Sequence, residues 1–234
     1  MTSTFEPNVI VVLGSESGVI KPVVTSLATK CHIVRIYNHT VPEANDNCTD
    51  LMGISSLNEC LDQLKISPDD QRIGFIGAAF KRQNSLFINE SPADLQDMLG
   101  TNISLYVECL TILLPRMVRS KYGRLVYLSS FRSVNPVRGA SIYSASKAFG
   151  ETLFAGIGKE YGRFNISSVS IRMGYFESGM MEDYESSKQE MARKSIALNR
   201  FGTSEDLLAA INFSFACEYV SSGVIELNGG LNLG

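Results

Sequence analysis

The sequence predicts an α/β fold with a single domain built on a doubly wound parallel β-sheet, with helices on both faces. Short apolar runs rich in Val and Ile alternate along the chain with longer segments of helical periodicity. This alternation is typical of parallel βαβ units, whose strands are buried on both faces. The chain has 234 residues, of which 44% are hydrophobic and 19% charged, and can bury one substantial core. We therefore expect one domain spanning residues 1–234.

Six apolar runs have the length and composition of strands. They are Val9–Leu13, His32–Ile36, Arg72–Gly77, Arg124–Ser129, Ser167–Arg172 and Val224–Leu227. Two long helices are predicted over Leu95–Val118 and Ile142–Tyr161, because apolar residues recur there three and four positions apart. Pro115 should kink or end the first of these helices.

Two segments have the composition of helix starts. In Ser91-Pro92-Ala93-Asp94 a capping residue precedes a proline and an acid, and Thr203-Ser204-Glu205-Asp206 has a similar pattern,. The longest polar stretch without periodicity is Glu177–Lys194. We interpret residues 177–194 as a surface lid rather than a domain boundary.

Composition argues against several classes of protein. The formal net charge is −3 and the Lys and Arg residues are scattered, so we expect no nucleic-acid or membrane surface. Five cysteines without a CxxC pair, and His32 and His39 without ligand-spaced partners, predict neither disulfides nor a metal site. No apolar run approaches the roughly 20 residues of a membrane span, and Met1–Asn8 does not resemble a secretion signal. We expect a cytoplasmic protein.

A turn with two glycines follows the first predicted strand and opens a helix. Backbone N–H groups at such a turn can bind a pyrophosphate, so Gly14, Ser17, Gly18 and Ile20 are candidate cofactor contacts. Glycines at a strand-to-helix turn also occur for the turn alone, and the sequence leaves that alternative open.

Tyr143 and Lys147 lie four residues apart on a predicted helix, so both side chains project from one face. An adjacent ammonium is expected to lower the pKa of Tyr143 and to make it a better proton donor at neutral pH. A second Tyr-xxx-Lys pair, Tyr184 and Lys188, is interpreted as solvated because it lies in the polar stretch. Ser130 distinguishes the first pair, since it stands 13 residues before Tyr143 at the end of a strand that should face a ligand crevice.

These segments, taken in order, resemble the short-chain dehydrogenase/reductase family, and the resemblance covers essentially the whole chain. Gly123–Ser130 followed by Tyr143–Ala148 is similar to the family's strand-borne serine and Tyr-xxx-Lys helix. Thr101-Asn102-Ile103 resembles the segment with the fourth catalytic residue, while Arg200–Asp206 and Gly223–Gly230 resemble the C-terminal signature. The short length fits the compact branch of 3-oxoacyl-carrier-protein reductases and related ketoreductases rather than the longer nucleotide-sugar epimerases.

The resemblance implies a Rossmann-type fold and an NAD(P)-dependent oxidoreductase that reduces a carbonyl or oxidises an alcohol. Tyr143 would give or take the proton, Ser130 would hydrogen-bond the reacting oxygen, and Lys147 would bind the nicotinamide ribose. Asn102 would hold a proton-relay water. Cofactor contacts are implied at Gly14, Ser17, Gly18, Ile20, Asn38, Asp50, Leu51, Ala78, Tyr143, Lys147, Gly174, Phe176 and Ser178, with Asp50 and Leu51 at the adenine.

Three departures from the family pattern affect the cofactor site. Ile20 replaces the third glycine and is expected to hold the helix away from the pyrophosphate. Gly77-Ala78-Ala79-Phe80 replaces Asn-Asn-Ala-Gly, which is expected to leave the Phe80 ring near the adenosine, and Met173-Gly174 replaces Pro-Gly. These departures support an alternative function, a non-catalytic binding or regulatory protein with a weakened cofactor site.

The segment after the second predicted strand bears on the choice of cofactor. Ile36-Tyr37-Asn38-His39 contains no acid to bind the ribose hydroxyls of NAD and repel a 2′-phosphate. Asn38 and His39 can donate hydrogen bonds to that phosphate, although Ser17 replaces the basic residue of many NADP-dependent relatives. We therefore expect NADP, with NAD as the alternative.

The expected partners are a small carbonyl or alcohol substrate and further copies of the chain. The resemblance implies a homo-oligomer, a dimer or tetramer, formed through the two long helices. Arg132 and Arg138 lie between Ser130 and Tyr143 and are compatible with an acidic or phosphopantetheine-borne substrate, but arginines in such a segment are more often solvated. The identity of the substrate does not follow from the fold.

Overall fold

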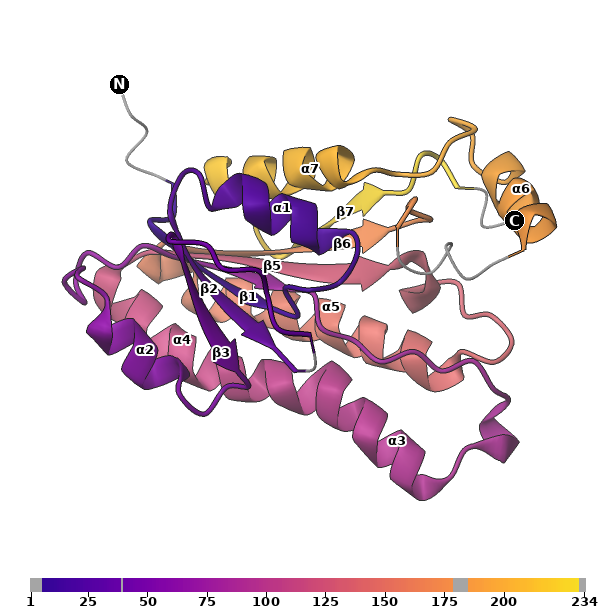
Figure 1. The fold of residues 1–234 in the computed structure, drawn as a ribbon, viewed down its shortest axis with the longest axis horizontal. Helices are drawn as coiled ribbons and strands as arrows, with labels where there is room; N and C mark the ends of the chain where they lie inside the picture. The colour runs from indigo at the N-terminus through magenta and orange to yellow at the C-terminus, as the bar shows by residue number, and fades with distance from the viewer. Residues whose placement is uncertain (1–5, 39, 179–184, 232–234) are drawn as a thin grey trace.

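The computed structural model of the chain describes residues 6–38, 40–178 and 185–231. In this part of the chain, seven parallel strands form one sheet in the order β3-β2-β1-β4-β5-β6-β7 (Figure 1). The strands are β1 (Val9–Leu13), β2 (His32–Tyr37), β3 (Cys48–Met52), β4 (Ile73–Gly77), β5 (Gly123–Ser130), β6 (Ile166–Met173) and β7 (Gly223–Leu227). The predicted doubly wound parallel sheet is confirmed, and the six predicted strands match within one residue at each end.

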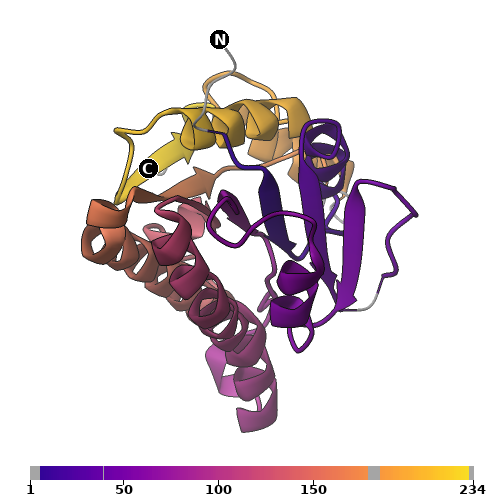
Figure 2. The same cartoon turned by 90° about the vertical axis from the view of Figure 1, so that its left-hand side faces the viewer.

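Helices cover both faces of the sheet, as the end-on view in Figure 2 shows. On one face α1 (Ile20–Leu27) packs beside α7 (Ser204–Ala216). The opposite face carries α2 (Leu57–Gln63), α4 (Leu105–Ser120) and α5 (Ser141–Tyr161). The remaining helical elements are η1 (Phe87–Asn89), α3 (Pro92–Leu99), η2 (Gly100–Ser104), η3 (Phe131–Ser133), η4 (Gly162–Phe164) and α6 (Ser186–Lys194).

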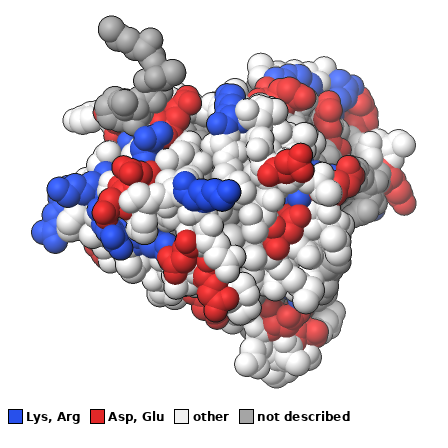
Figure 3. Space-filling view, turned by 60° about the vertical axis from the view of Figure 1, so that its left-hand side comes forward, with Lys and Arg blue, Asp and Glu red and all other residues white. Residues whose placement is uncertain are grey.

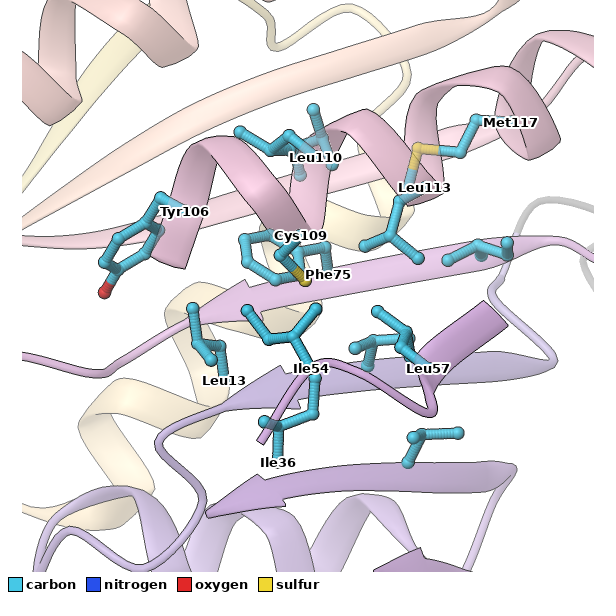
Figure 4. Packing of buried hydrophobic residues seen from close by; sticks show 14 of the residues in the cluster. Leu13, Ile36, Ile54, Leu57, Phe75, Tyr106, Cys109, Leu110, Leu113 and Met117 are labelled. Carbon is cyan, nitrogen blue, oxygen red and sulfur yellow. The ribbon is translucent and has the colours of Figure 1, made fainter. Parts of the chain in front are cut away.

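The larger part of the core lies between the sheet and α2, α4 and α5. Figure 4 shows Phe75 of β4 beneath Cys109 and Leu113 of α4, with Leu57 of α2 reaching the same layer. All four side chains are buried. The apolar stripe of α4 is thus matched to a strand that is buried along its whole length, which is how a parallel sheet covered on both faces is stabilised.

The order of the strands reverses between β1 and β4, because the chain runs from β1 outward to β3 and then returns to β4 beside β1. In open α/β sheets, ligands bind outside the carboxyl ends of the strands at such a switch point. The turns that follow Leu13 and Gly77 therefore lie side by side at this crevice.

Helix α5 can approach the sheet closely because residue 150 has no side chain. A Cβ atom at Gly150 would lie 2.2 Å from the ring of Tyr127 on β5, far inside van der Waals contact. Tyr127 instead stacks on Phe154, with ring centroids 4.9 Å apart. This close contact fixes the height of α5 above β5, and α5 carries both Tyr143 and Lys147.

The edge strand β3 was not predicted from the sequence. Its residues, Cys48-Thr49-Asp50-Leu51-Met52, are only partly buried and lack the apolar run that marks the inner strands. Its place is set by parallel pairing with β2 and by an ion pair between Arg35 Nε and Asp50 Oδ1 at 2.6 Å. Both features join residues on two separate strands, with Arg35 and Asp50 15 positions apart, so local composition does not reveal them.

Residues 92–120 form a nearly continuous helical stretch in which the π-helical turn η2 joins α3 to α4. The predicted helix starts at Ser91 and Thr203 are confirmed, each with a capping box. The prediction that Pro115 could end the helix is wrong, since α4 continues to Ser120. Leu113 and Met117, on either side of the proline, are fully buried, and their packing outweighs the loss of one hydrogen bond.

By length and composition, the helical stretch Pro92–Ser120 is apolar enough to cross a membrane. This is weak evidence, because core helices of soluble proteins pass the same test. Here Tyr106, Leu110 and Leu113 face the sheet and are buried in the core.

The predicted lid contains a helix that the sequence did not predict. Helix α6 has no buried residue, and Glu190 forms ion pairs with Arg193 at 2.7 Å and with Lys194 at 3.5 Å. Such pairs one turn apart stabilise a helix that has little apolar contact. Residues 179–184 of the predicted lid lie outside the described residues.

Candidate active site

A pocket opens at the carboxyl ends of the central strands, at the switch point of the sheet. It holds about 680 Å³ of empty space, its open mouth included. Nine of the predicted site residues line it: Ser17, Gly18, Ala78, Ser130, Tyr143, Lys147, Gly174, Phe176 and Ser178. Five segments of the chain thus meet at one site, as the sequence predicted.

The glycine turn after β1 forms one rim of this pocket. Gly14 has a φ of +84°, and a Cβ atom there would lie 2.5 Å from the backbone nitrogen of Ala79, so the contact between the turns after β1 and β4 requires glycine. Val19 precedes α1 and forms no side-chain capping bond. The first two N–H groups of α1, at Ile20 and Lys21, both donate to the carbonyl of Ser17 at 3.0 Å, so the turn itself satisfies them.

The structure corrects the expectation for Ile20. Its side chain is fully buried beneath α1 in the core that also contains Val12 and Leu128, and it does not line the pocket. A branched side chain is accommodated because it points into the sheet and not toward the turn. Ile20 therefore does not hold the helix start away from a ligand, and it does not contribute its side chain to the site.

Ser130, Tyr143 and Lys147 converge in the pocket. Ser130 ends β5, and its hydroxyl lies near enough to Tyr143 to lower the pKa of the phenol. Lys147 lies one turn along α5, and its Nζ donates to the carbonyl of Leu128 at 2.7 Å. All three residues are at least 95% buried. The predicted proximity of these three residues, drawn from sequence spacing, agrees with this arrangement.

Burial controls the ionisation of both titratable residues. Desolvation raises the pKa of Tyr143, against the opposing effects of the Ser130 hydroxyl and of the positive charges of Arg132 and Arg82. Desolvation lowers the pKa of Lys147 to about 7, against the negative charge of Glu151. The expectation that Lys147 lowers the pKa of Tyr143 is thus corrected, because the lysine itself is desolvated and holds its proton weakly.

Phe80 lies in the pocket beside Lys147 and Tyr143. The sequence led us to expect its ring near the adenosine instead. Its ring centroid is 5.0 Å from Lys147 Nζ and 6.1 Å from the Tyr143 ring, edge to face. The backbone of Lys81, the next residue, forms two hydrogen bonds with the side chain of Asn102.

Asn102 is buried in the π-helical turn η2, and its side chain is fully engaged. Its Oδ1 accepts from the Lys81 N–H at 2.6 Å, while its Nδ2 donates to the Lys81 carbonyl at 2.9 Å and to Ser146 Oγ at 3.1 Å. Both amide donors are therefore in use. Asn102 ties the segment after β4 to α5, and its side chain has no donor left for a water.

The residues predicted to bind the adenosine half lie beyond this pocket. Asn38 is exposed just after β2, and Leu51 is half-buried on β3. Both carboxylate oxygens of Asp50 accept from Arg35, at 2.6 and 2.9 Å. Arg35, which the sequence analysis missed, thus holds the acid predicted to contact adenine. His39 lies outside the described residues.

A buried ionic cluster behind Ser130 was also missed. Glu151 accepts hydrogen bonds from Ser129 Oγ at 2.5 Å, Ser133 Oγ at 2.6 Å and Arg172 Nη2 at 2.6 Å. The side chains of Glu151 and Arg172 are 11% and 14% exposed, and Arg172 also contacts Glu226. One signal was available, because Glu151 stands four residues after Lys147 and therefore projects from the same face of the helix.

The second Tyr-xxx-Lys pair is not part of the pocket. Lys188 is 63% exposed on α6 and lies 4.0 Å from Glu185, which agrees with the interpretation of a solvated lysine. Tyr184 lies outside the described residues.

Comparisons with known proteins agree with this geometry. Residues 75–189 match the family profile of short chain dehydrogenases. Bovine 3-oxoacyl-[acyl-carrier-protein] reductase is 27% identical over 163 residues, which is 69% of this chain and 68% of that protein. Carbonyl reductase family member 4 of Xenopus laevis is 24% identical over 236 residues, covering 96% of this chain and 98% of that protein.

A solved structure extends the likeness to the whole fold. The 3-oxoacyl (acyl-carrier-protein) reductase of Agrobacterium tumefaciens C58, crystallised with NADP bound, superposes with a TM-score of 0.82 at 19% identity, covering 97% of this chain and 95% of that one. The family profile spans β4 to α6, the segment that carries Ser130, Tyr143 and Lys147. The chain is therefore similar to short chain dehydrogenases in sequence from β4 to α6, and in fold over nearly its whole length.

Proposed function

We propose that this protein is an NAD(P)-dependent oxidoreductase that reduces a carbonyl compound, or oxidises the corresponding alcohol, with Tyr143 as general acid and base. One observation carries the proposal. Ser130 and Tyr143 line the same pocket at the switch point of the sheet, near enough for the serine hydroxyl to lower the pKa of the phenol, so that one carbonyl oxygen can receive hydrogen bonds from both. The names of the sequence relatives, which are reductases of carbonyl compounds, support it.

The residues present fit a nicotinamide cofactor. The glycine turn at Gly14 to Gly18 and the start of α1 suit a pyrophosphate, and Lys147 Nζ suits a ribose hydroxyl. When bound, the cofactor supplies the hydride. The chain's own residues orient the substrate and handle the proton: Ser130 holds the oxygen, Tyr143 delivers the proton, and Asn102 fixes the segment that bears Phe80.

We propose NADP(H) as the cofactor, with NAD(H) as the alternative. Support comes from the segment after β2, where Asn38 is exposed and no acid stands to repel a 2′-phosphate,. Neighbouring folds crystallised with NADP agree with this choice.

The test of the reaction compares Tyr143→Phe with the parent protein. The variant should turn over a panel of ketones about 10²–10⁴-fold more slowly, because it has no hydroxyl proton to donate. It should bind NADPH nearly as well as the parent, because the substitution removes little volume. Tyr219→Phe, at a fully exposed tyrosine, is the control. Comparable turnover by both variants would remove Tyr143 from the mechanism. Failure of the parent to bind NADPH or NADH at millimolar concentration, followed by fluorescence, would favour a non-catalytic binding protein.

We further propose a single-domain cytoplasmic enzyme that forms homo-oligomers through its long helices. Val107 on α4 and Phe149 on α5 are 41% and 42% exposed, and both would be covered if another copy of the chain packed against these helices. Lys and Arg are interspersed with Asp and Glu on the face drawn in Figure 3, which supports a small-molecule partner more than nucleic acid or membrane. Light scattering should give a multiple of 25.7 kDa; a monomer would contradict the oligomer.

A further inference from the structure

Arg132 is a buried cation whose charge is not balanced by any described residue. It is 8% exposed, and its Nε is fully enclosed without a hydrogen-bond partner. Within residues 6–38, 40–178 and 185–231, its guanidinium forms no hydrogen bond or ion pair, only a contact with the Phe131 ring. Burying an unpaired charge costs free energy, so such a group next to residues that line a pocket suggests that a ligand completes it.

The position of Arg132 ties it to the reacting groups. It lies on η3, immediately after Ser130, and its backbone N–H donates to Ser130 Oγ at 3.3 Å. The guanidinium carbon is 5.8 Å from the Phe131 ring centroid. Phe131 in turn packs edge to face on Tyr175, with centroids 5.1 Å apart, and Tyr175 lines the pocket. The charge of Arg132 also reaches Tyr143, where it opposes the rise in the pKa of the phenol.

The acid that contacts this turn is already engaged. Glu151 accepts from Ser129, Ser133 and Arg172 and has no contact with Arg132. By contrast, Arg138 lies in the same loop and is exposed, so water satisfies its charge. The two arginines that the sequence could not separate therefore have different environments, since only Arg132 is buried and has an enclosed N–H without a partner.

We propose that Arg132 binds a carboxylate of the substrate, and that the substrate is a short oxo acid or the corresponding hydroxy acid. The inference rests on the proposed function and deepens it. A planar guanidinium pairs with a carboxylate through two parallel hydrogen bonds. Because Arg132 stands two residues from Ser130, the carboxylate lies a few bonds from the carbonyl that Ser130 and Tyr143 hold. The carboxylate itself is unchanged by the reaction.

The first experiment compares acids with their neutral esters. It measures kcat/KM with NADPH for acetoacetate and 2-oxobutanoate, and for the methyl ester of each. The parent should prefer the acids by about tenfold or more. Arg132→Met should lose about tenfold or more on the acids and little on the esters, whereas Arg138→Met should match the parent on all four compounds.

A second experiment does not depend on turnover. The thermal unfolding midpoint is measured with 3-hydroxybutanoate, with its methyl ester and with inorganic phosphate. The acid alone should stabilise the parent and Arg138→Met, and should not stabilise Arg132→Met. Without ligand, Arg132→Met should unfold at the same temperature as the parent or higher, because an unpaired buried charge has been removed.

The outcomes separate this inference from the proposed function. Esters reduced as well as acids, or equal losses on both in Arg132→Met, would overturn the carboxylate site and leave the oxidoreductase intact. Stabilisation by phosphate and not by the acid would also overturn it. If no carbonyl compound is reduced but 3-hydroxybutanoate still stabilises the protein through Arg132, the anion site stands and the proposed function fails.

Discussion

Phe80 occupies space beside the two residues on which the proposed chemistry depends. Its ring lies 5.0 Å from Lys147 Nζ and 6.1 Å from the Tyr143 ring, and it is 38% exposed at the mouth of the pocket. The ring therefore covers a lysine that, in the proposed function, must reach a ribose hydroxyl. A ligand bound to Lys147 has to displace this contact.

Replacing Phe80 should therefore affect cofactor binding directly. We expect Phe80→Ala to tighten NADPH binding by up to about tenfold, because a cation–π contact with a desolvated cation is worth roughly 1–2 kcal/mol. Calorimetric titration measures the change. Phe87→Ala, at a ring that is 58% exposed on η1, is the matched control and should leave affinity unchanged. Weaker binding by Phe80→Ala would show that the ring supports the cofactor instead of competing with it.

At the scale of residues, sequence reasoning succeeded where the relation was local. Tyr143 and Lys147 share a helix face because they are one turn apart, and Ser130 follows from the end of a predicted strand. It failed where the answer depended on what surrounds a side chain. The direction of the pKa shift of Tyr143 and the burial of Ile20 both follow from packing between distant segments, which spacing does not contain.

At the scale of elements, Glu151 joins three parts of the site. From α5 it accepts hydrogen bonds from residues on both sides of Ser130, and it pairs with Arg172 of β6. These bonds hold the pKa of Glu151 below its ordinary value despite burial. The turn that presents Ser130 is thereby fixed to the helix that presents Tyr143.

Removing this charge should destabilise the protein in a pH-dependent way. Glu151→Gln should lower the free energy of unfolding by roughly 3–5 kcal/mol at pH 7, since it leaves Arg172 buried without its main partner. Because the folded pKa is depressed, the contribution of Glu151 is fully present above its unfolded pKa near 4.5 and is lost as the pH falls through the folded value. Urea unfolding between pH 3 and 7 measures this, with exposed Glu160→Gln as control. If the free energy of unfolding of Glu151→Gln fell at acidic pH as steeply as that of the parent, this pH dependence could not be assigned to Glu151.

Strands and helices were predicted correctly from the sequence where their residues show a clear apolar pattern. The inner strands were found within one residue because they are continuous Val- and Ile-rich runs. Strand β3 was not predicted because the ion pair between Arg35 and Asp50 holds it in place, rather than apolar burial. Helix α6 was not predicted because its stabilising ion pairs lie on an otherwise exposed helix. The passage of α4 through Pro115 depends on Leu113 and Met117 docking on the sheet, a tertiary effect that local propensity cannot indicate.

At the scale of the whole molecule, the buried Lys147 should set part of the pH dependence of stability. Its folded pKa of about 7 lies below the ordinary value of 10.5, so the unfolded chain binds the proton more tightly. The stability cost of burial is complete below pH 7 and fades as the pH rises from 7 to 10.5. Lys147→Met should therefore be more stable than the parent by roughly 2–5 kcal/mol at pH 6, with the difference shrinking by pH 10.

Chemical denaturation across that pH range measures the difference. Lys159→Met, at an exposed lysine of the same helix, should follow the parent at every pH. A constant offset between Lys147→Met and the parent from pH 6 to 10 would show that Lys147 keeps its proton in the folded state.

Helix α6 should be the part of the described molecule that responds most to ligands. It contains no buried residue, so in the free protein its amides should exchange with solvent rapidly. With NADPH and a substrate bound we expect protection of residues 185–194, as a lid that closes over the complex. Hydrogen exchange read by mass spectrometry measures this, with α5 as the internal reference. Strong protection of α6 without ligand would contradict the prediction.

The missing side chain at position 150 has a consequence for how this protein can change. Because a single methyl group there would meet the Tyr127 ring at 2.2 Å, it would lift α5 and move Tyr143 away from Ser130, although neither residue is altered. The absence of a side chain at position 150 therefore sets the distance between Tyr143, the proposed proton donor, and the strand that carries Ser130. Substitutions in the lid and in the loop after Ser130 can change substrate preference. A substitution at Gly150, which touches no ligand, would instead abolish the proposed activity.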